Sequence, residues 1–138
     1  MIKEQYKYSD VTSKIIGCAI EVHNNLGNGF QEVVYQRALS IEMKLQNILH
    51  EREKELPLSY KGHKIGTRRV DFFVDKKIMV ELKAIKVLED VHLAQAINYL
   101  EAYNMEIGLL INFGSVKLQI KRVMKPVGKS PGPGIKSF

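Results

Sequence analysis

Residues 69–85, RVDFFVDKKIMVELKAI, consist of two apolar-rich runs on either side of a polar turn at residues 75–77. Two such runs separated by a short polar turn predict a β-hairpin. With a three-residue loop, the register of the hairpin places Asp71 opposite Glu81, and directly opposed residues share one face of a sheet. This hairpin therefore decides which polar side chains meet in the middle of the fold.

The two faces of the hairpin differ in chemistry, because side chains alternate along a strand. Asp71, Glu81 and Lys83 share the polar face. Two neighbouring carboxylates raise the pKa of at least one of them unless a cation lies between them. The other face is expected to be apolar and to consist of Val70, Phe72, Val74, Val80 and Leu82.

A hard divalent metal ion suits the polar face of this hairpin. Mg²⁺ takes oxygen ligands, often from only one or two protein carboxylates, and keeps its other positions for water and substrate phosphate. Lys83 would then hold an attacking water or help to deprotonate it. The same residues also fit a simpler interpretation, a solvated hairpin face with one cross-strand Lys–Glu pair.

The composition is that of one soluble globular domain. The chain has 138 residues, of which 45% are hydrophobic and 26% are charged. No apolar run approaches the length of a membrane span, and the first residues, MIKEQYKYSD, lack the apolar core of a secretory signal. We therefore expect a cytoplasmic protein that makes no membrane contact.

The net charge of +6 is concentrated near the C-terminus. Residues 115–138 contain no acidic side chain and six basic ones: Lys117, Lys121, Arg122, Lys125, Lys129 and Lys136. Such a segment suits a polyanion, although it equally suits a solubilising tail. We expect one domain over residues 1–124, followed by a basic Pro/Gly-rich tail over residues 125–138.

Hydrophobic spacing predicts three helices and five strands. The helices are expected over residues 10–25, 31–46 and 89–103, and the strands over 50–60, 64–74, 78–83, 107–113 and 116–124. In the second helix, the apolar stripe is formed by Val34, Ala38, Ile41 and Leu45. The order α-α-β-β-β-α-β-β predicts an α+β fold, with helices packed on a mixed sheet.

This order, with Asp71 on one strand and Glu81-Leu82-Lys83 on the next, resembles the PD-(D/E)XK nuclease superfamily, whose core is restriction-endonuclease-like. Residues 29–35, GFQEVVY, fit the Gly-x-x-Glu-x-x-Tyr signature of the small GxxExxY proteins. Residues 95–99, QAINY, fit the Gln-x-x-x-Tyr motif of RecB-type nucleases. One departure is Val70, which stands where many members have Pro and which suits a strand better.

The resemblance implies a set of site residues. The implied metal ligands are Asp71, Glu81, the Leu82 backbone carbonyl and Glu32, the last either directly or through the outer shell. Lys83 would orient the nucleophilic water and offset charge in the transition state. Gln95 and Tyr99 would steer the substrate phosphate and hold the geometry of the site.

The function implied is Mg²⁺- or Mn²⁺-dependent hydrolysis of phosphodiester bonds in nucleic acid, with DNA as the favoured substrate. The alternative is a non-catalytic nucleic-acid-binding or assembly module that kept the nuclease fold. The intact Asp71, Glu81 and Lys83 argue against this alternative. The small size favours a homodimer. His92 is interpreted as a surface residue. Arg68, Arg69 and Tyr103 fit either the flank of a substrate channel or a solvated surface, and they are left out of the site.

Overall fold

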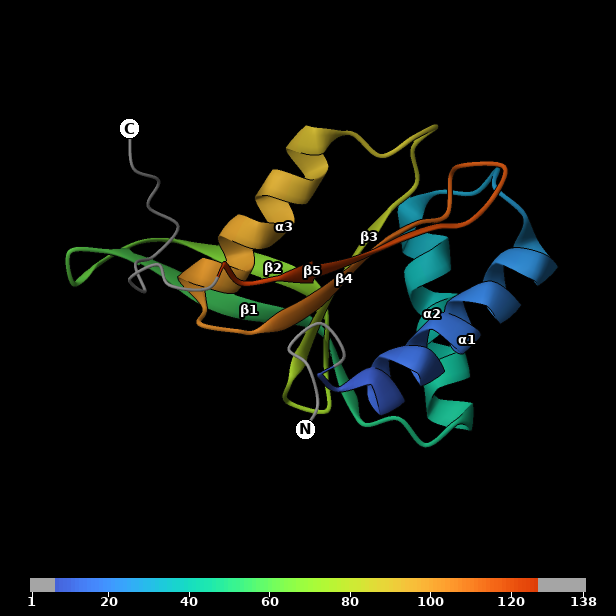
Figure 1. The fold of residues 1–138 in the computed structure, drawn as a ribbon, viewed down its shortest axis with the longest axis horizontal. Helices are drawn as coiled ribbons and strands as arrows, with labels where there is room; N and C mark the ends of the chain where they lie inside the picture. Colours follow the sequence, from blue (N-terminus) through green and yellow to red (C-terminus); the bar gives the residue numbers. More distant parts are fainter. Residues whose placement is uncertain (1–6, 127–138) are drawn as a thin grey trace.

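The helices and strands follow one another in the predicted order (Figure 1). The structure is a computed structural model and describes residues 7–126. The helices are α1 (Ser9–Leu26), α2 (Glu32–Leu45) and α3 (Asp90–Ala102), and the strands are β1 (His50–Tyr60), β2 (His63–Val74), β3 (Ile78–Lys83), β4 (Ile107–Asn112) and β5 (Gln119–Met124). Most of the tail expected at 125–138 lies outside the described residues.

The strands form one five-stranded sheet in the order β1-β2-β3-β4-β5. Neighbouring strands are antiparallel except β3 and β4, which are parallel because α3 connects them as a crossover. The predicted mixed sheet is therefore confirmed. The strand that carries Pro57, β1, lies at an edge, where a residue without a backbone N–H is tolerated.

The central hairpin has the predicted loop. Val74 pairs with Ile78, so residues 75–77 form the connection between β2 and β3. Asp75 and Lys76 adopt left-handed φ angles of 51° and 56°, which a tight loop of this length requires. Over residues 72–74 and 78–80 the hairpin register is therefore the one expected from the sequence, and Asp71 and Glu81 lie just beyond the last of these pairs.

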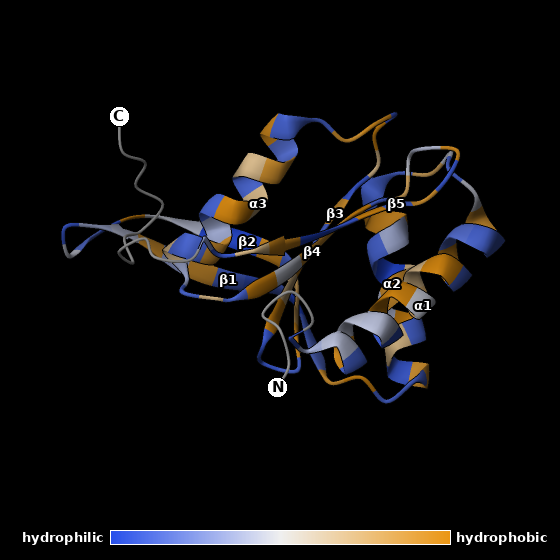
Figure 2. Cartoon of the chain, in the orientation of Figure 1, coloured by the Kyte–Doolittle hydropathy of each residue, from blue (hydrophilic) through white to orange (hydrophobic). Residues whose placement is uncertain are grey.

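The helices cover both faces of the sheet. One core cluster joins α1 and α2 to residues of β2, β3 and β4, and a smaller one joins α3 to the opposite face. β4 is buried along its whole length and lies between them. Figure 2 shows hydrophilic and hydrophobic residues alternating along the helices, as expected for helices with one face on the core.

The expected core face of α2 is wrong. Tyr35, Leu39 and Met43 are fully buried, whereas Ile41 and Leu45 are 59% and 67% exposed. Two apolar stripes run along this helix with the same period, so spacing alone did not distinguish them. The larger side chains of the buried stripe fill the space against the sheet, and this rotation also places Gln36 and Ser40 on the inner side.

Val70 also differs from the expectation. It packs with Met79 and Leu100 in the α3 cluster, whereas Phe72 belongs to the α1–α2 cluster. The pairing of β2 with β3 ends at Phe72. On β1, Glu53 lies between the partners of Val70 and Phe72 and has a left-handed φ of 55°. This local twist interrupts the alternation of faces at the level of Asp71.

One element boundary is also corrected. β5 begins at Gln119 and not at residue 116, and Val116 is 86% exposed in the preceding loop. On α3, the apolar Val91 is 58% exposed, because the helix contacts the sheet through Ala96 and Leu100. Over residues 7–126, no helix has both the length and the apolar character needed to cross a membrane.

Candidate active site

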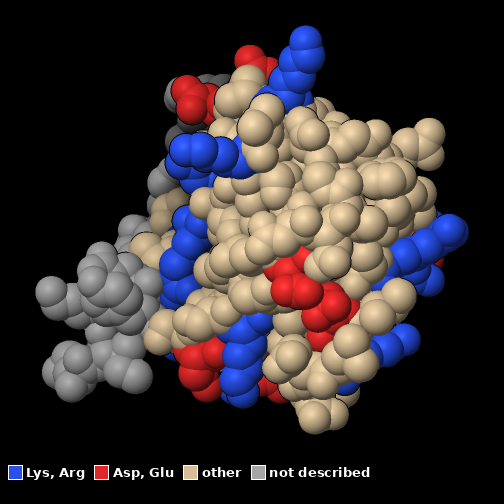
Figure 3. All heavy atoms as spheres, turned by 90° about the vertical axis from the view of Figure 1, so that its right-hand side faces the viewer, with Lys and Arg blue, Asp and Glu red and all other residues tan. Residues whose placement is uncertain are grey.

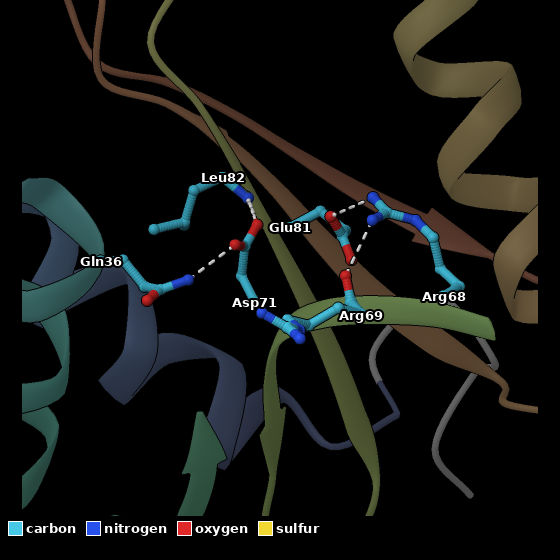
Figure 4. Close-up of polar contacts among 6 residues, drawn as sticks. All are labelled: Gln36, Arg68, Arg69, Asp71, Glu81 and Leu82. Atoms are coloured by element: carbon cyan, nitrogen blue, oxygen red, sulfur yellow. Dashed lines mark hydrogen bonds and ion pairs between the residues drawn. The ribbon is translucent and has the colours of Figure 1, made fainter. Parts of the chain in front are cut away.

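Asp71 lies where β2 separates from β3, and its carboxylate links β3 to α2. Asp71 Oδ2 accepts a hydrogen bond from the backbone N–H of Leu82 at 2.8 Å, and Oδ1 accepts one from Gln36 Nε2 at 2.8 Å (Figure 4). The first bond stands in place of further strand pairing. Asp71 is therefore held from two elements, while each of its oxygens keeps a second lone pair for another ligand.

Glu81 is the buried carboxyl of the site, at 5% exposure. Its Oε2 pairs with Arg68 Nη2 at 3.1 Å, and its Oε1 has no hydrogen-bond partner within the part of the chain that the structure describes. Burial first, and then repulsion from Asp71, raise the pKa of Glu81 to about 8, while Arg68 acts in the opposite direction. At neutral pH the metal-free site therefore holds a proton on Glu81.

Glu32 and Lys83 act on the same charge cluster. Loss of water contact and repulsion from Asp71 raise the pKa of Glu32, and the positive charges of Lys83 and Arg68 lower it. Lys83 also lowers the pKa of Glu81. Asp71 and Lys83 therefore shift the pKa values of both Glu32 on α2 and Glu81 on β3. All four side chains are close enough to interact electrostatically.

The carboxylates of the site meet only part of what a divalent ion needs as ligands. Within residues 7–126, no three or more His, Cys, Asp or Glu side chains are grouped so that together they could hold a metal ion. The buried, unpartnered Oε1 of Glu81 and the nearby Asp71 nevertheless fit a hard cation, because Mg²⁺ often uses one or two carboxylates and completes its shell with water. The roles of Glu32 and of the Leu82 carbonyl remain predictions.

A narrow cleft between β3 and α3 brings together four of the residues expected from the sequence. Its lining consists of Arg68, Glu81, Lys83, His92, Gln95, Ala96, Tyr99 and Leu110. The cleft volume of about 10 Å³ is room for roughly one water molecule. Gln95 and Tyr99 thus face Glu81 and Lys83, whereas Asp71 contacts the α2 side through Gln36.

Arg68 belongs to this cleft, although it was left out of the site expected from the sequence. Its guanidinium pairs with Glu81 and lies 4.6 Å from the centre of the Tyr99 ring, and it also donates to the Arg69 carbonyl oxygen. Arg69 itself pairs with Glu53 and with the exposed side chain of Glu55 on β1. Adjacent basic residues alternate between faces of a strand, and sequence alone gave no reason to choose between them.

Gln36 is the other site residue that sequence reasoning missed. It is 5% exposed and donates to Asp71 from the inner side of α2. A signal was present, because Gln36 lies four residues after Glu32 and therefore on the same side of the helix. The incorrect choice of the buried stripe hid this signal.

Tyr35, the tyrosine of the Gly-x-x-Glu-x-x-Tyr signature, is a structural residue. Its hydroxyl donates to the Gly27 carbonyl oxygen at 2.6 Å and accepts from the backbone N–H of Phe30 at 3.1 Å. Its ring stacks on Phe113 with centroids 4.7 Å apart. These contacts hold the loop before α2 and thereby set where the helix starts and where Glu32 lies.

Asn112 anchors the loop that follows Lys83. It is fully buried and pairs with Lys83 across β3 and β4. Its side-chain oxygen accepts from the Ile85 backbone N–H at 3.0 Å, and its side-chain nitrogen donates to the Ile85 carbonyl oxygen at 2.9 Å.

His92 has a comparable local role at the start of α3. Its Nδ1 accepts a hydrogen bond from the Glu89 backbone N–H and thereby caps the helix. These bonds fix the connection between the strand of Lys83 and the helix of Gln95.

The mixed sheet flanked by helices is a restriction-endonuclease-like fold. The chain belongs to the PD-(D/E)XK nuclease superfamily, because the model of that family matches residues 9–123. The crystal structure of SSO0001 has a similar fold, with a TM-score of 0.55 at 18% sequence identity. The similarity covers 89% of this chain but only 62% of that one. A comparison with curated proteins found no match.

Proposed function

We propose that the protein is a Mg²⁺- or Mn²⁺-dependent nuclease that hydrolyses phosphodiester bonds of nucleic acid, with DNA as the favoured substrate. The observation that carries the proposal is the buried Oε1 of Glu81, which has no hydrogen-bond partner among the described residues and lies beside Asp71 and Lys83. A buried carboxyl group with one unpartnered oxygen, which keeps a proton at neutral pH because it is buried beside Asp71, is costly unless it has a function or a ligand.

Asp71 and Glu81 would hold the ion, with the Leu82 carbonyl and Glu32 as further direct or outer-shell partners. When bound, a divalent ion supplies Lewis-acid polarisation of a phosphate oxygen and lowers the pKa of water. Gln36 fixes the orientation of the Asp71 carboxylate through its hydrogen bond.

The cationic and polar residues of the cleft act on the substrate. The Lys83 ammonium would orient the attacking water and stabilise negative charge that develops on the phosphate. Gln95 and Tyr99, which line the same cleft, would contact a phosphate oxygen and position the scissile bond. Because the cleft is narrow, α3 must move away from β3, or the phosphate must approach from the rim.

Two finer assignments complete the proposal. The chain would belong to the GxxExxY group, an assignment supported by the sequence of residues 29–35, with Tyr35 as the structural tyrosine of that signature. A homodimer would bring two such sites to the two strands of a duplex, and this expectation rests on the small size of the chain.

A non-catalytic nucleic-acid-binding module is the second candidate. The ion pair between Arg68 and Glu81 favours it, because Arg68 occupies one oxygen of a carboxylate that a nuclease needs for its ion. The two functions make different demands on this pair. A nuclease must release or share the Arg68 contact when the ion binds, whereas a binding module keeps it.

Cleavage assays distinguish the two functions. Wild-type protein is incubated with single-stranded, linear, circular and branched DNA and with RNA, each with Mg²⁺ and with Mn²⁺. We expect metal-dependent cleavage that Asp71→Asn and Lys83→Ala abolish while circular dichroism stays unchanged. Asp75→Asn is the matched control, because this exposed aspartate lies in the loop of the same hairpin. Undiminished DNA binding with the metal chelated, together with no cleavage of any substrate, would favour the binding module.

A further inference from the structure

A second polar surface lies on the other side of Asp71, between α2 and β1. We call it the α2–β1 groove, and its lining residues are Arg37, Ser40, Ile41, Lys44, His50 and Arg52. Its volume is about 340 Å³, much larger than that of the cleft between β3 and α3. The proposed nuclease activity assigns no role to these residues.

The groove carries unbalanced positive charge. Arg37, Lys44 and Arg52 are exposed, and the side chain of none of them makes an ion pair or hydrogen bond with another described residue. Arg69, by contrast, is flanked by Glu53 and Glu55. Three unpaired cations around one groove repel each other and attract an anion of matching extent.

The remaining polar residues of the groove support its shape. His50 Nδ1 lies 2.8 Å from the Ile48 carbonyl oxygen and Nε2 lies 2.8 Å from Ser40 Oγ, so both ring nitrogens are occupied. The His50 ring also meets the Phe72 ring edge-on. His50 therefore joins β1 to α2, and the three cations are the groups left to bind a ligand.

The position of the groove relates it to the active site. Arg37 follows Gln36, the partner of Asp71, and Arg52 pairs across the sheet with Phe72, the neighbour of Asp71. Gln36 and Arg37 are consecutive on α2 and adjacent strands are about 4.8 Å apart, so the groove starts within roughly 10 Å of Asp71. A nucleic-acid strand advances about 3.4 Å per nucleotide along the helix axis, so this distance corresponds to up to about three nucleotides.

The neighbouring groove between α1 and α2 has the opposite character. Its lining includes Glu21 and Glu42 with a single cation, Lys14. Figure 3 shows the side of the molecule on which these helices lie, with acidic side chains near the middle and Lys and Arg toward the margins. A polyanion is therefore repelled from the α1–α2 face and attracted to the α2–β1 groove.

We infer that the α2–β1 groove binds the phosphate backbone of the nucleic-acid strand, within about three nucleotides of the scissile phosphate. This inference rests on the proposed function, because it takes the strand that the active site would cut. Arg37, Lys44 and Arg52 contact phosphate oxygens, and the exposed Ile41 offers an apolar contact to a sugar or base.

Binding measured without cleavage tests the groove. Kd for a labelled oligonucleotide is determined with the metal chelated and at several salt concentrations, for Arg37→Glu, Arg52→Glu and Lys44→Ala. For each variant we expect Kd to rise roughly five- to tenfold at 0.1 M salt, and the slope of log Kd against log salt to fall by about one. Lys64→Glu is the matched control, because Lys64 is an exposed cation near the far end of β2.

The outcomes separate the groove from the active site. Wild-type affinity and salt slope in all three groove variants would overturn the inference, even if the protein cuts DNA. The expected loss of binding without any cleavage by the wild type would support the groove and refute the nuclease. Parallel DNA and RNA arms identify which strand the groove takes. Should Arg52→Glu not fold, the two exposed α2 positions still test the inference.

Discussion

Arg68 pairs with Glu81 at 3.1 Å at the place where the proposed nuclease needs a divalent cation. The arginine is held there by a second contact, because its guanidinium lies over the Tyr99 ring on α3. In the metal-free protein, Arg68 and a proton together balance the charge of the two carboxylates. Metal binding, proton release and the position of α3 are therefore expected to be coupled at this residue.

Stability of the metal-free protein should fall with rising pH. Glu81 has a pKa of about 8 in the folded chain against 4.5 as its ordinary value, so the folded state keeps a proton that the unfolded state loses between these values. The contribution of Glu81 to the free energy of unfolding is therefore largest below about pH 4.5. It decreases as the pH rises from there to about pH 8. Since one pKa unit corresponds to about 1.4 kcal/mol, the whole shift corresponds to a loss of up to about 5 kcal/mol, of which roughly 3 kcal/mol falls between pH 5.5 and pH 8.5.

Urea unfolding at pH 5.5 and pH 8.5 with a chelator measures this change. Glu81→Gln should remove most of the pH dependence, because the amide does not ionise. Glu55→Gln, at an exposed site on β1, should retain the wild-type profile. If the free energy of unfolding changes equally with pH in the wild type and in Glu81→Gln, Glu81 does not carry the proton.

Mn²⁺ binding should release a proton. The ion requires the ionised form of Glu81, so affinity is expected to rise with pH up to about pH 8 and to level off above it. Isothermal titration calorimetry at pH 7 in buffers of different ionisation enthalpy reports the number of protons released, for which we expect close to one. Asp71→Asn should abolish binding, and a pH-independent affinity for the wild type would contradict this scheme.

Gln36→Ala should impair catalysis without unfolding the protein. The substitution removes the hydrogen bond that orients Asp71 Oδ1 but leaves Asp71 itself in place. Loss of a residue that orients a metal ligand typically lowers activity or metal affinity about 10- to 100-fold. Rates of DNA cleavage and Mn²⁺ affinity measure the effect, with the exposed Gln46 at the end of α2 changed to Ala as the control. Wild-type values for both quantities would show that Asp71 needs no such support.

Tyr35→Phe should destabilise the chain through the loop before α2. The variant keeps the stacking on Phe113 but loses the hydrogen bonds to Gly27 and Phe30. We expect a loss of about 1 kcal/mol in the free energy of unfolding, because two partly buried polar groups of the backbone lose their partner. Urea denaturation measures this value, and an unchanged midpoint would mean that water replaces the hydroxyl.

Gly114→Ala should be more damaging than its size suggests. A β-carbon at this position would overlap the backbone of Ala84 and Ile85, in the loop that leads from Lys83 to α3. We expect the free energy of unfolding to fall by at least about 2 kcal/mol, as for other substitutions that force a backbone shift. Gly66→Ala, where the added carbon meets open space, is the control in the same unfolding assay.

The order of elements and the central hairpin were predictable from sequence. Helical spacing, the Lys61-Gly62 turn and the three-residue loop at 75–77 are local features, and local features set element type and hairpin register. The acidic and basic residues on β3 were recognisable for the same reason, because alternation along one strand depends only on neighbouring residues.

The tertiary structure alone decided how these elements face one another. Which stripe of α2 enters the core depends on how well each fills the space against the sheet, and periodicity does not measure this fit. That choice brings Gln36 to Asp71, and the twist at Glu53 and Asp71 carries Val70 to the opposite core cluster. Sequence thus determined the chemistry available on each element, and long-range packing determined which groups of that chemistry meet.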